Sequence, residues 1–336
     1  MKVGINGFGR IGRDVARILI EGNYPDLELV QINASGDMED LKHLFKYDSL
    51  YGTLNKDLKV DEDSFVVDGK RINFSHERDP QLIDWSANGV EIVIDATGAF
   101  KDKEGLGKHI RGTVKKVILT APGKGLDNTI VMGVNDDTYD PATQNIISNA
   151  SCTTNCLAPV AKVIEDSFGI KRGLMTTVHS YTGDQMLLDA RHKKDRRRAR
   201  AAALSMVPTT TGAAKAVTEV IPSLKGKLNG FALRVPTPTV SIVDVVFELE
   251  KEANRDDVNR ALKEASEGYM KGILGYTEDE LVSIDFKGCE LSSIVDSKLT
   301  MGIENNMVKV ISWYDNEWGY STRVVDLAVM VARADK

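Results

Sequence analysis

A cysteine stands where the sequence predicts the start of a helix. Residues 149–156 have the sequence Asn-Ala-Ser-Cys-Thr-Thr-Asn-Cys, and the stretch Leu157 to Phe168 that follows is typical of a helix. The first turn of a helix carries unpaired N–H groups and the positive end of the macrodipole, so it stabilises a thiolate. We therefore expect Cys152 to be a nucleophile with a depressed pKa.

Three glycines near the N-terminus form the pattern G-x-G-x-x-G, at Gly7, Gly9 and Gly12. The pattern follows a predicted strand, Lys2–Asn6, and opens a predicted helix, Ile11–Glu21, which is the context of a dinucleotide-binding loop. The first glycine allows the tight turn, the second the approach of a pyrophosphate, and the third close packing of helix and strand. The alternative is that the glycines serve only a tight turn.

The end of the second predicted strand, Leu27–Asn33, lacks a residue that such loops usually have. A carboxylate there binds the ribose hydroxyls of the adenosine. Here the strand is followed by Ala34, Ser35 and Gly36. Nothing at this position repels a 2′-phosphate, and the Ser35 hydroxyl can donate to one.

Composition limits the function classes. The 336 residues suffice for two domains, and the net charge of −6 does not suggest general binding of polyanions. Three cysteines make no disulfide framework and favour a reducing compartment. We find no pattern of a signal peptide or membrane span, so the cytoplasm is the expected location.

The chain divides into two halves of different pattern. In residues 1–150 short apolar runs alternate with helical patterns, which predicts an α/β unit with a Rossmann-type, doubly wound parallel sheet. Longer strands, such as Val240–Leu249 and Met307–Tyr314, predict an α+β catalytic domain on a mostly antiparallel sheet at 151–315. The apolar C-terminal helix, within 316–336, is expected to join the dinucleotide-binding domain.

With both motifs in one chain, the sequence resembles the phosphorylating glyceraldehyde-3-phosphate dehydrogenases from end to end. The segments that carry the resemblance are INGFGRIGR, LFKYDSLYG, SHERDP, DATGAF, NASCTTNCLAPV, PTTTGAAKAV, ALRVPTPTVS and YDNEWGYSTRVVDL. It implies that Cys152 is the nucleophile and that His179 is its base partner. A histidine near a strand end would otherwise be structural. Cys156 is expected to be a buried helix residue.

The resemblance also implies two anion sites. Thr182 and Arg234 would hold the substrate's C3 phosphate, with Asp184 beside them. The attacking phosphate would lie against Ser151, Thr153, Thr211 and Gly212, together with an arginine from the run 196–198, for which the register favours Arg197. Hydroxyls, a backbone N–H and guanidinium groups suit phosphate oxygens.

The cofactor site implied by the resemblance extends beyond the glycines. Arg10 and Ile11 would lie at the pyrophosphate, Arg78 near the adenine, Thr120 near the nicotinamide-side ribose, and Asn316 near the carboxamide. No metal is expected.

The implied reaction converts D-glyceraldehyde 3-phosphate, inorganic phosphate and NAD or NADP reversibly to 1,3-bisphosphoglycerate through a Cys152 thioester. It serves glycolysis or gluconeogenesis, and the family forms homotetramers.

Two departures from the family concern the cofactor. Ala34 replaces the aspartate of the NAD-specific pattern, and Leu188-Asp189-Ala190-Arg191 replaces the usual loop after the histidine. Arg191 can offer a cation to a 2′-phosphate in a neighbouring subunit. We hypothesise that the enzyme uses NADP, alone or alongside NAD. The alternative is NAD with looser ribose binding.

Other functions remain open. Erythrose-4-phosphate dehydrogenase and a non-phosphorylating aldehyde dehydrogenase share the cysteine and histidine, although the segment Thr209–Lys215 favours phosphate as acceptor. A binding protein without catalysis predicts a broken catalytic pair or a basic surface. The run His192–Arg200 could form a nucleic-acid patch, but the net charge argues against that as the main function.

Overall fold

A computed structural model describes residues 1–335, which form two compact units. The first comprises Met1–Ile130, Asp137–Ala150 and the stretch from Ser321 onward, and the second comprises Val131–Asp136 and Ser151–Tyr320. Residues 131–136 and 316–320, which the sequence analysis placed in the first domain, belong to the second unit. In the first of these segments Gly133 lies against Met270 and Ile273.

The first unit is built on a nine-stranded sheet with the order β10-β11-β9-β8-β1-β2-β7-β6-β5. All neighbours are parallel except the β5-β6-β7 edge, which is antiparallel, so the predicted Rossmann-type sheet is confirmed. The strand order reverses at β1, which lies between β2 and β8, and ligands bind at such a switch point. The strands are β1 (Lys2–Asn6), β2 (Glu28–Asn33), β5 (Leu58–Val60), β6 (Ser64–Val67), β7 (Lys70–Ser75), β8 (Ile92–Asp95), β9 (Lys116–Leu119), β10 (Asn128–Thr129) and β11 (Ile146–Ser148).

Helices connect these strands, as the alternating pattern predicted. They are α1 (Arg10–Glu21), α2 (Met38–Lys46) and α3 (Lys103–Gly107). Helix α7 (Trp318–Ala334) follows the last strand of the chain, and β3 (Tyr47–Asp48) and β4 (Gly52–Thr53) form a small separate sheet. Single 3₁₀ turns, distributed over both units, are η1 (Pro80–Leu82), η2 (Ser86–Asn88), η3 (Asp136–Thr138), η4 (Ala202–Leu204), η5 (Pro222–Leu224), η6 (Ser283–Phe286) and η7 (Ser297–Leu299).

The second unit contains an eight-stranded sheet with the order β13-β14-β12-β15-β19-β17-β16, to which β18 adds by pairing with β19. The central pairs β12–β15 and β15–β19 are antiparallel, whereas β12–β14 is parallel, which confirms the predicted mostly antiparallel sheet. The strands are β12 (Ile170–Ser180), β13 (Val207–Thr210), β14 (Leu228–Val235), β15 (Ser241–Leu249), β16 (Leu274–Thr277), β17 (Ser293–Asp296), β18 (Met301–Ile303) and β19 (Met307–Tyr314).

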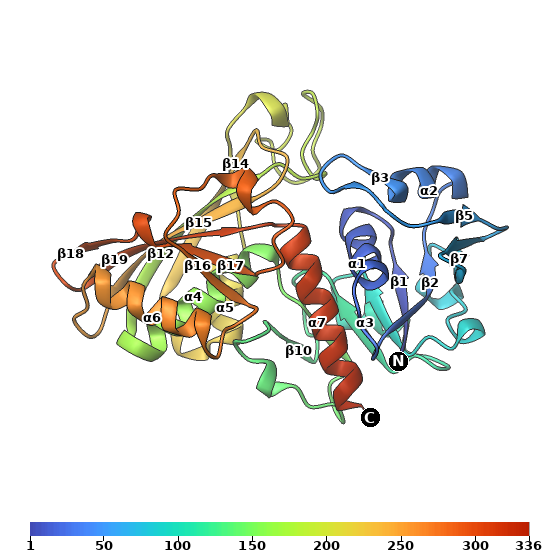
Figure 1. Ribbon diagram of the computed structural model, residues 1–336, viewed down its shortest axis with the longest axis horizontal. Helices are drawn as coiled ribbons and strands as arrows, with labels where there is room; N and C mark the ends of the chain where they lie inside the picture. Colours follow the sequence, from blue (N-terminus) through green and yellow to red (C-terminus); the bar gives the residue numbers. More distant parts are fainter. Residues whose placement is uncertain (336) are drawn as a thin grey trace. The chain divides into compact units, whose positions relative to one another are not determined.

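Three helices pack together against this second sheet. They are α4 (Cys152–Phe168), α5 (Ala213–Val220) and α6 (Arg255–Glu267), with α4 in contact with both other helices and with four of the strands (Figure 1). Along β15 the residues alternate between fully buried and partly buried, so one strand face lies in the core. The helical side of the sheet therefore holds the start of α4, and with it Cys152, in a fixed place.

An aromatic cluster supports the glycine loop of the first unit. The Phe65 ring lies 4.5 Å from Phe74, 6.0 Å from Phe45 and 6.2 Å from Phe8, measured between centroids. Phe8 lies between Gly7 and Gly9, so its packing in the aromatic cluster holds the glycine loop in place.

We predict that Phe65→Ala lowers the free energy of unfolding by about 3–5 kcal/mol, because Phe65 is fully buried and its loss leaves a cavity. Chemical denaturation measures the effect. Leu44→Ala is the control, because that side chain on α2 is 48% exposed and its loss should cost less than about 0.5 kcal/mol. Equal costs for the two variants would contradict the prediction.

Candidate active site

Cys152 is the first residue of helix α4, as the sequence predicted. Ser151 is its N-cap, and the Ser151 hydroxyl accepts the Thr154 N–H at 3.1 Å. Ala150, which precedes the cap, has a positive φ of 55° and turns the chain sharply into the helix. The half-buried sulfur is thus held beside the free N–H groups of the first turn.

His179 lies at the end of β12, and its Nε2 atom is 3.5 Å from the sulfur of Cys152. The other ring nitrogen, Nδ1, lies 2.7 Å from the carbonyl oxygen of Ser180. A carbonyl only accepts, so Nδ1 carries the proton and Nε2 faces the thiol with a lone pair. The fold therefore assembles a thiol and a correctly oriented base from segments 27 residues apart.

Burial determines the charge state of this pair. It lowers the pKa of His179 to about 3, and the nearby Arg234 guanidinium acts in the same direction. Burial also raises the pKa of the Cys152 thiol, although Arg234 and hydrogen bonds from Thr153 oppose it. The predicted depressed pKa of Cys152 is therefore wrong in direction, because desolvation outweighs the helix N-terminus. The resting pair is a neutral thiol beside a neutral imidazole.

Arg234 places a positive charge next to the pair. It lies on β14 in register with His179 on the parallel strand β12. Its Nη1 atom lies 3.0 Å from the Ser180 carbonyl, 3.0 Å from His179 Nδ1 and 3.3 Å from the Thr182 hydroxyl. Its buried Nε has no hydrogen-bond partner among the residues described. Since Nδ1 carries a proton, both it and Arg234 donate to the Ser180 carbonyl. A guanidinium with an unused donor beside a threonine hydroxyl suits an anion.

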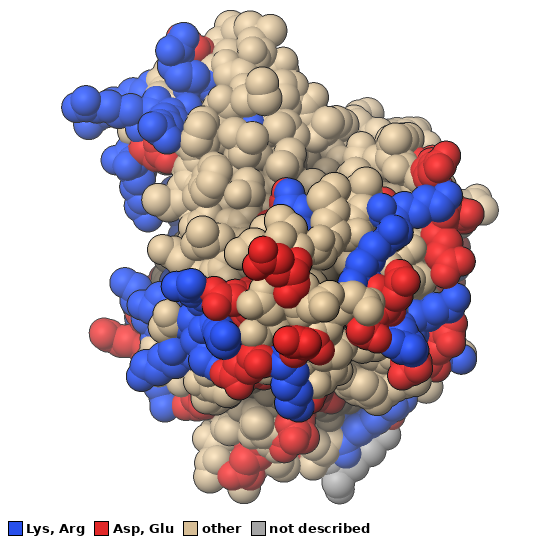
Figure 2. Space-filling view, turned by 90° about the vertical axis from the view of Figure 1, so that its left-hand side faces the viewer, with Lys and Arg blue, Asp and Glu red and all other residues tan. Residues whose placement is uncertain are grey.

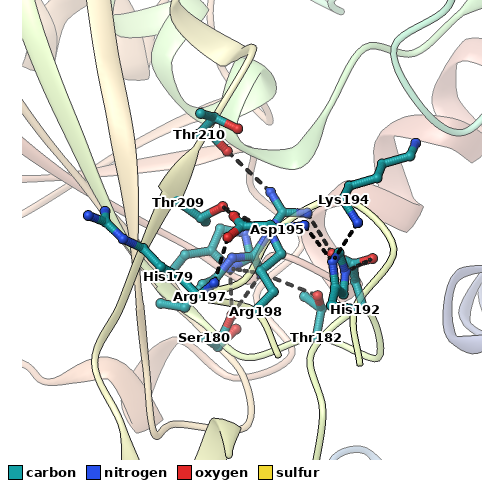
Figure 3. Close-up of polar contacts among 12 residues, drawn as sticks. His179, Ser180, Thr182, His192, Lys194, Asp195, Arg197, Arg198, Thr209 and Thr210 are labelled. Carbon is teal, nitrogen blue, oxygen red and sulfur yellow. Dashed lines mark hydrogen bonds and ion pairs between the residues drawn. The ribbon is translucent and has the colours of Figure 1, made fainter. Parts of the chain in front are cut away.

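A second arginine enters the cluster, and it is Arg198. Its guanidinium bonds Asp184 at 2.6 Å and the Thr209 hydroxyl at 2.8 Å, and it faces the Thr210 carbonyl at 3.4 Å. Arg197, which the sequence register favoured, contributes its backbone N–H to Asp195, and its side chain extends away from Thr209 in Figure 3. The side chains of adjacent loop residues point in different directions. An error of one position in the predicted register therefore selects Arg197 in place of Arg198.

Asp184 therefore orients Arg198, whereas the sequence analysis placed it beside Arg234. Its carboxylate accepts from Arg198, and His192 lies 3.4 Å away. Much of the basic run is neutralised within its own loop, since Arg198 also faces Asp195 and Arg200 pairs with Asp189. On the face drawn in Figure 2 acidic and basic side chains are interspersed, apart from one corner where Lys and Arg gather.

The threonines near the cysteine are held in two ways. Thr153 is buried, and its hydroxyl lies 2.9 Å from that of Tyr314, which also bonds Thr177. Thr211 accepts the Ala213 N–H, and Gly212 is the N-cap of α5. Sequence reasoning missed Tyr314, although its position in the YDNEW segment was a usable signal. Its ring also meets the His179 ring edge-on at 5.9 Å.

Asn316 has a fixed amide. Its side-chain oxygen accepts from the hydroxyls of Ser180 and Ser241, at 2.8 and 2.9 Å, and the residue is buried. These two bonds determine which end of the amide carries the NH₂ group. The side chain is thus prepared to donate to a carboxamide oxygen.

The glycines of the first unit have the backbone conformation and the surrounding space that their predicted roles require. Gly7 has a φ of +96°, and a Cβ atom there would meet Thr97 N at 2.8 Å. A Cβ at Gly12 would lie 2.0 Å from the Gly7 carbonyl, whereas nothing lies within 4 Å of one at Gly9. Arg10 and Ile11 begin helix α1, whose N–H groups suit a pyrophosphate.

A cavity of about 490 Å³ opens beside this loop. Gly7 and Gly9 line it together with Ala34, Ser35 and Arg78 from the segments after β2 and β7. A dinucleotide fits these residues, because the open face at Gly9 admits phosphates and no carboxylate is present at position 34. Thr120 follows β9 at the same sheet edge, whereas the exposed Arg191 lies in the second unit.

Together, the nucleotide-binding sheet and the adjacent side chains of Cys152 and His179 are typical of nicotinamide-dependent dehydrogenases that act through a cysteine. Two family models match the chain: the NAD binding domain of glyceraldehyde 3-phosphate dehydrogenase over residues 1–103, and its C-terminal domain over residues 151–316. The chain belongs to the glyceraldehyde-3-phosphate dehydrogenase family.

Relatives match over almost the whole chain. Glyceraldehyde-3-phosphate dehydrogenase 1 of Bacillus cereus is 59% identical, with 97% of each chain covered. The glyceraldehyde-3-phosphate dehydrogenase of Priestia megaterium is also 59% identical, over 99% of this chain and 98% of its own. The chloroplastic form GAPB of Arabidopsis thaliana is 56% identical over 99% of this chain and 75% of its own.

Two further observations concern the part of the chain that the structure describes. No helix in it is both long and apolar enough to cross a membrane. No cluster of His, Cys, Asp and Glu in it has the arrangement of a metal site.

We predict that His179 makes stability fall as pH drops below about 6.5. The unfolded chain then binds a proton that the folded site, with a pKa of about 3, refuses, so the folded state loses about 1.4 kcal/mol per pH unit down to pH 3. Denaturation midpoints of wild type and His179→Asn between pH 7 and 4 measure the difference in slope. His43→Asn, which removes an exposed imidazole, is the control. Parallel curves for wild type and His179→Asn would refute the assignment.

Proposed function

We propose that the protein oxidises D-glyceraldehyde 3-phosphate to 1,3-bisphosphoglycerate, with inorganic phosphate and NADP or NAD, through a thioester on Cys152. The observation that carries the proposal is the 3.5 Å contact between the Cys152 sulfur and His179 Nε2, with Arg234 beside it. The relatives described above all carry the glyceraldehyde-3-phosphate dehydrogenase name. Neither erythrose-4-phosphate dehydrogenase nor a non-phosphorylating enzyme gains support from them.

The neutral pair explains how the sulfur becomes reactive. As Cys152 Sγ bonds the aldehyde carbon, its proton passes to His179 Nε2 and then to the aldehyde oxygen, which gives a hemithioacetal. The bound nicotinamide supplies a hydride acceptor. His179 Nε2 takes the hydroxyl proton while the carbon loses its hydride, and a thioester remains. The Ser180 carbonyl stabilises the imidazolium at each stage through Nδ1.

Phosphate then attacks the thioester carbon, and Cys152 leaves as thiolate and recovers a proton from His179. Arg234 with Thr182 and Arg198 with Thr209 provide two cationic groups with hydroxyl neighbours. One is proposed for the substrate's C3 phosphate and the other for the attacking phosphate, together with Ser151, Thr153, Thr211 and Gly212. Arg198 takes the role that the sequence analysis gave to Arg197.

For the cofactor we propose NADP, alone or alongside NAD. The proposal is supported by Ala34, which is small and uncharged at the position where a carboxylate would bind ribose hydroxyls. Ser35 and Arg78 line the same cavity and can donate to a 2′-phosphate. Arg191 is proposed to add a cation from a neighbouring subunit.

We also propose a homotetramer located in the cytoplasm. Three free cysteines suit a reducing compartment. Exposed apolar side chains on the second sheet, among them Leu174, Phe231 and Met307, suit contact between subunits.

Omitting phosphate tests the thioester mechanism. We expect a burst of about one reduced cofactor per chain without phosphate, because the acylated Cys152 then has no acceptor, and multiple turnovers once phosphate is added. Cys152→Ser should lose the burst and at least about 10⁴-fold in kcat.

Cys156→Ser is the matched control for this experiment. Cys156 is fully buried, burial raises its pKa to about 12, and its sulfur faces Ser293 and Ser312, so its loss should leave the burst intact. Sustained turnover without phosphate would instead indicate a hydrolytic dehydrogenase. A higher kcat/KM with erythrose 4-phosphate would identify the other alternative.

Ala34→Asp tests the cofactor proposal. We expect kcat/KM with NADP to fall at least about tenfold, or about 1.4 kcal/mol, because the carboxylate repels the 2′-phosphate, while the value with NAD rises. Ala34→Asn, of similar size without charge, should have a smaller effect. A wild-type preference for NAD of about 20-fold, or about 1.8 kcal/mol, would sink the proposal.

A further inference from the structure

Three neighbouring strands of the first sheet end in polar side chains that bond one another. Asn33, Asn6 and Asp95 are the last residues of β2, β1 and β8, and the strand pairing aligns them. Asn33 Nδ2 donates to Asn6 Oδ1 at 2.8 Å, and Asn6 Nδ2 donates to Asp95 Oδ2 at 2.8 Å. We call Asn33, Asn6 and Asp95 the strand-end ladder. Its members are all at least 96% buried.

The buried carboxylate of Asp95 is satisfied by four donors from three residues. Oδ2 accepts from Asn6 and faces His109 Nε2 at 3.3 Å, and Oδ1 accepts from the Thr97 N–H at 3.1 Å and the Thr97 hydroxyl at 2.7 Å. A buried carboxylate needs such partners to offset its lost hydration. Each oxygen is thus committed to donors on a different side.

A hydrogen bond from Trp85 fixes the tautomer of His109. Trp85 Nε1 donates to His109 Nδ1 at 3.0 Å, and an indole N–H can only donate. His109 therefore carries its proton on Nε2 and donates it to Asp95. The imidazole cannot turn this nitrogen into an acceptor without losing the bond from Trp85.

Both ends of the ladder reach walls of the cofactor cavity. At one end Asp95 holds Thr97, whose peptide packs against Gly7. At the other end Asn33 Oδ1 accepts the Glu77 N–H at 3.0 Å, and Asn33 Nδ2 donates to the Glu77 carbonyl at 2.8 Å. Glu77, Arg78 and Thr97 all line the cavity.

We propose that the strand-end ladder positions the two walls of the cofactor cavity relative to each other, with Asp95 as the positioning residue at the Thr97 end. The proposal rests on the proposed function insofar as this cavity binds a nicotinamide dinucleotide. Asp95 acts through Thr97 and Asn6, and it does not touch the reacting atoms. The ladder lies at the switch point of the sheet, so a displaced side chain moves the groove and leaves the Cys152–His179 pair of the other unit unchanged.

Asp95→Asn tests the ladder. The NH₂ group of the new asparagine must face hydrogen-bond donors in either orientation, because Asn6 and His109 lie on one side and Thr97 on the other. We expect the Kd of NADP and of NAD, measured by fluorescence titration of the full chain, to rise at least about tenfold. The kcat at saturating cofactor and the rate of Cys152 alkylation by iodoacetamide should stay within about twofold. These two readouts separate positioning from general loss of structure.

Trp85→Phe is the matched control. It removes the hydrogen bond from Trp85 Nε1 to His109 Nδ1 and leaves the bonds among Asn33, Asn6 and Asp95 in place. We expect a lower Tm and a cofactor Kd within about twofold of wild type. Thr97→Val provides a second variant at an exposed position, should Asp95→Asn fail to fold, and it should raise the Kd about threefold or more.

A folded Asp95→Asn with unchanged Kd would overturn the proposal, and so would unchanged Kd in Thr97→Val where Asp95→Asn does not fold. Equal weakening by Trp85→Phe would overturn it too, since the effect would follow stability. Failure of the wild type to bind either dinucleotide would instead count against the proposed function.

Discussion

The burial of His179 beside the positive charge of Arg234 is the constraint on which the catalytic site depends. Arg234 lies in register with His179 on the neighbouring strand; His179 is buried and Arg234 is partly buried. Burial keeps the imidazole neutral, and repulsion by the Arg234 charge acts in the same direction. Burial also keeps the proton on the thiol, although Arg234 favours the thiolate. The guanidinium therefore remains available for an anion, and the proton moves only when the sulfur bonds carbon.

The Ser180 residue connects the groups of the catalytic site. The Ser180 carbonyl accepts from His179 Nδ1 and from Arg234, while the Ser180 hydroxyl donates to Asn316. A single residue at the end of β12 thus fixes the tautomer of the base, the place of the cation and the orientation of an amide. Moving the strand end would disturb all three, which explains why the site stands at the end of a long, doubly paired strand.

Local signals in the sequence predicted the helices and strands and the position of the candidate nucleophile. The arginine at the anion site and the pKa of Cys152 depend on the tertiary structure. Cys152 at the helix start follows from the Ser151 cap and the apolar run behind it, and the roles of Gly7 and Gly12 follow from steric limits on the backbone. The choice between Arg197 and Arg198 depends on the path of one loop, and no periodicity records it. The pKa of Cys152 depends on burial by distant segments, which outweighs the local helix N-terminus.

Two adjacent residues, Ala34 and Asn33, affect the choice of cofactor and the positioning of the cofactor cavity separately. Ala34 is buried, and its hydrogen bonds come from its backbone: its N–H donates to the Ser75 carbonyl, and its own carbonyl faces His76 Nδ1 at 2.7 Å. Asn33, one residue earlier, contributes its side chain to the strand-end ladder. Substitution at position 34 can therefore alter the charge offered to the ribose while Asn33 still holds the wall of the cavity. Adjacent residues thus carry specificity and geometry separately, so that one can change without the other.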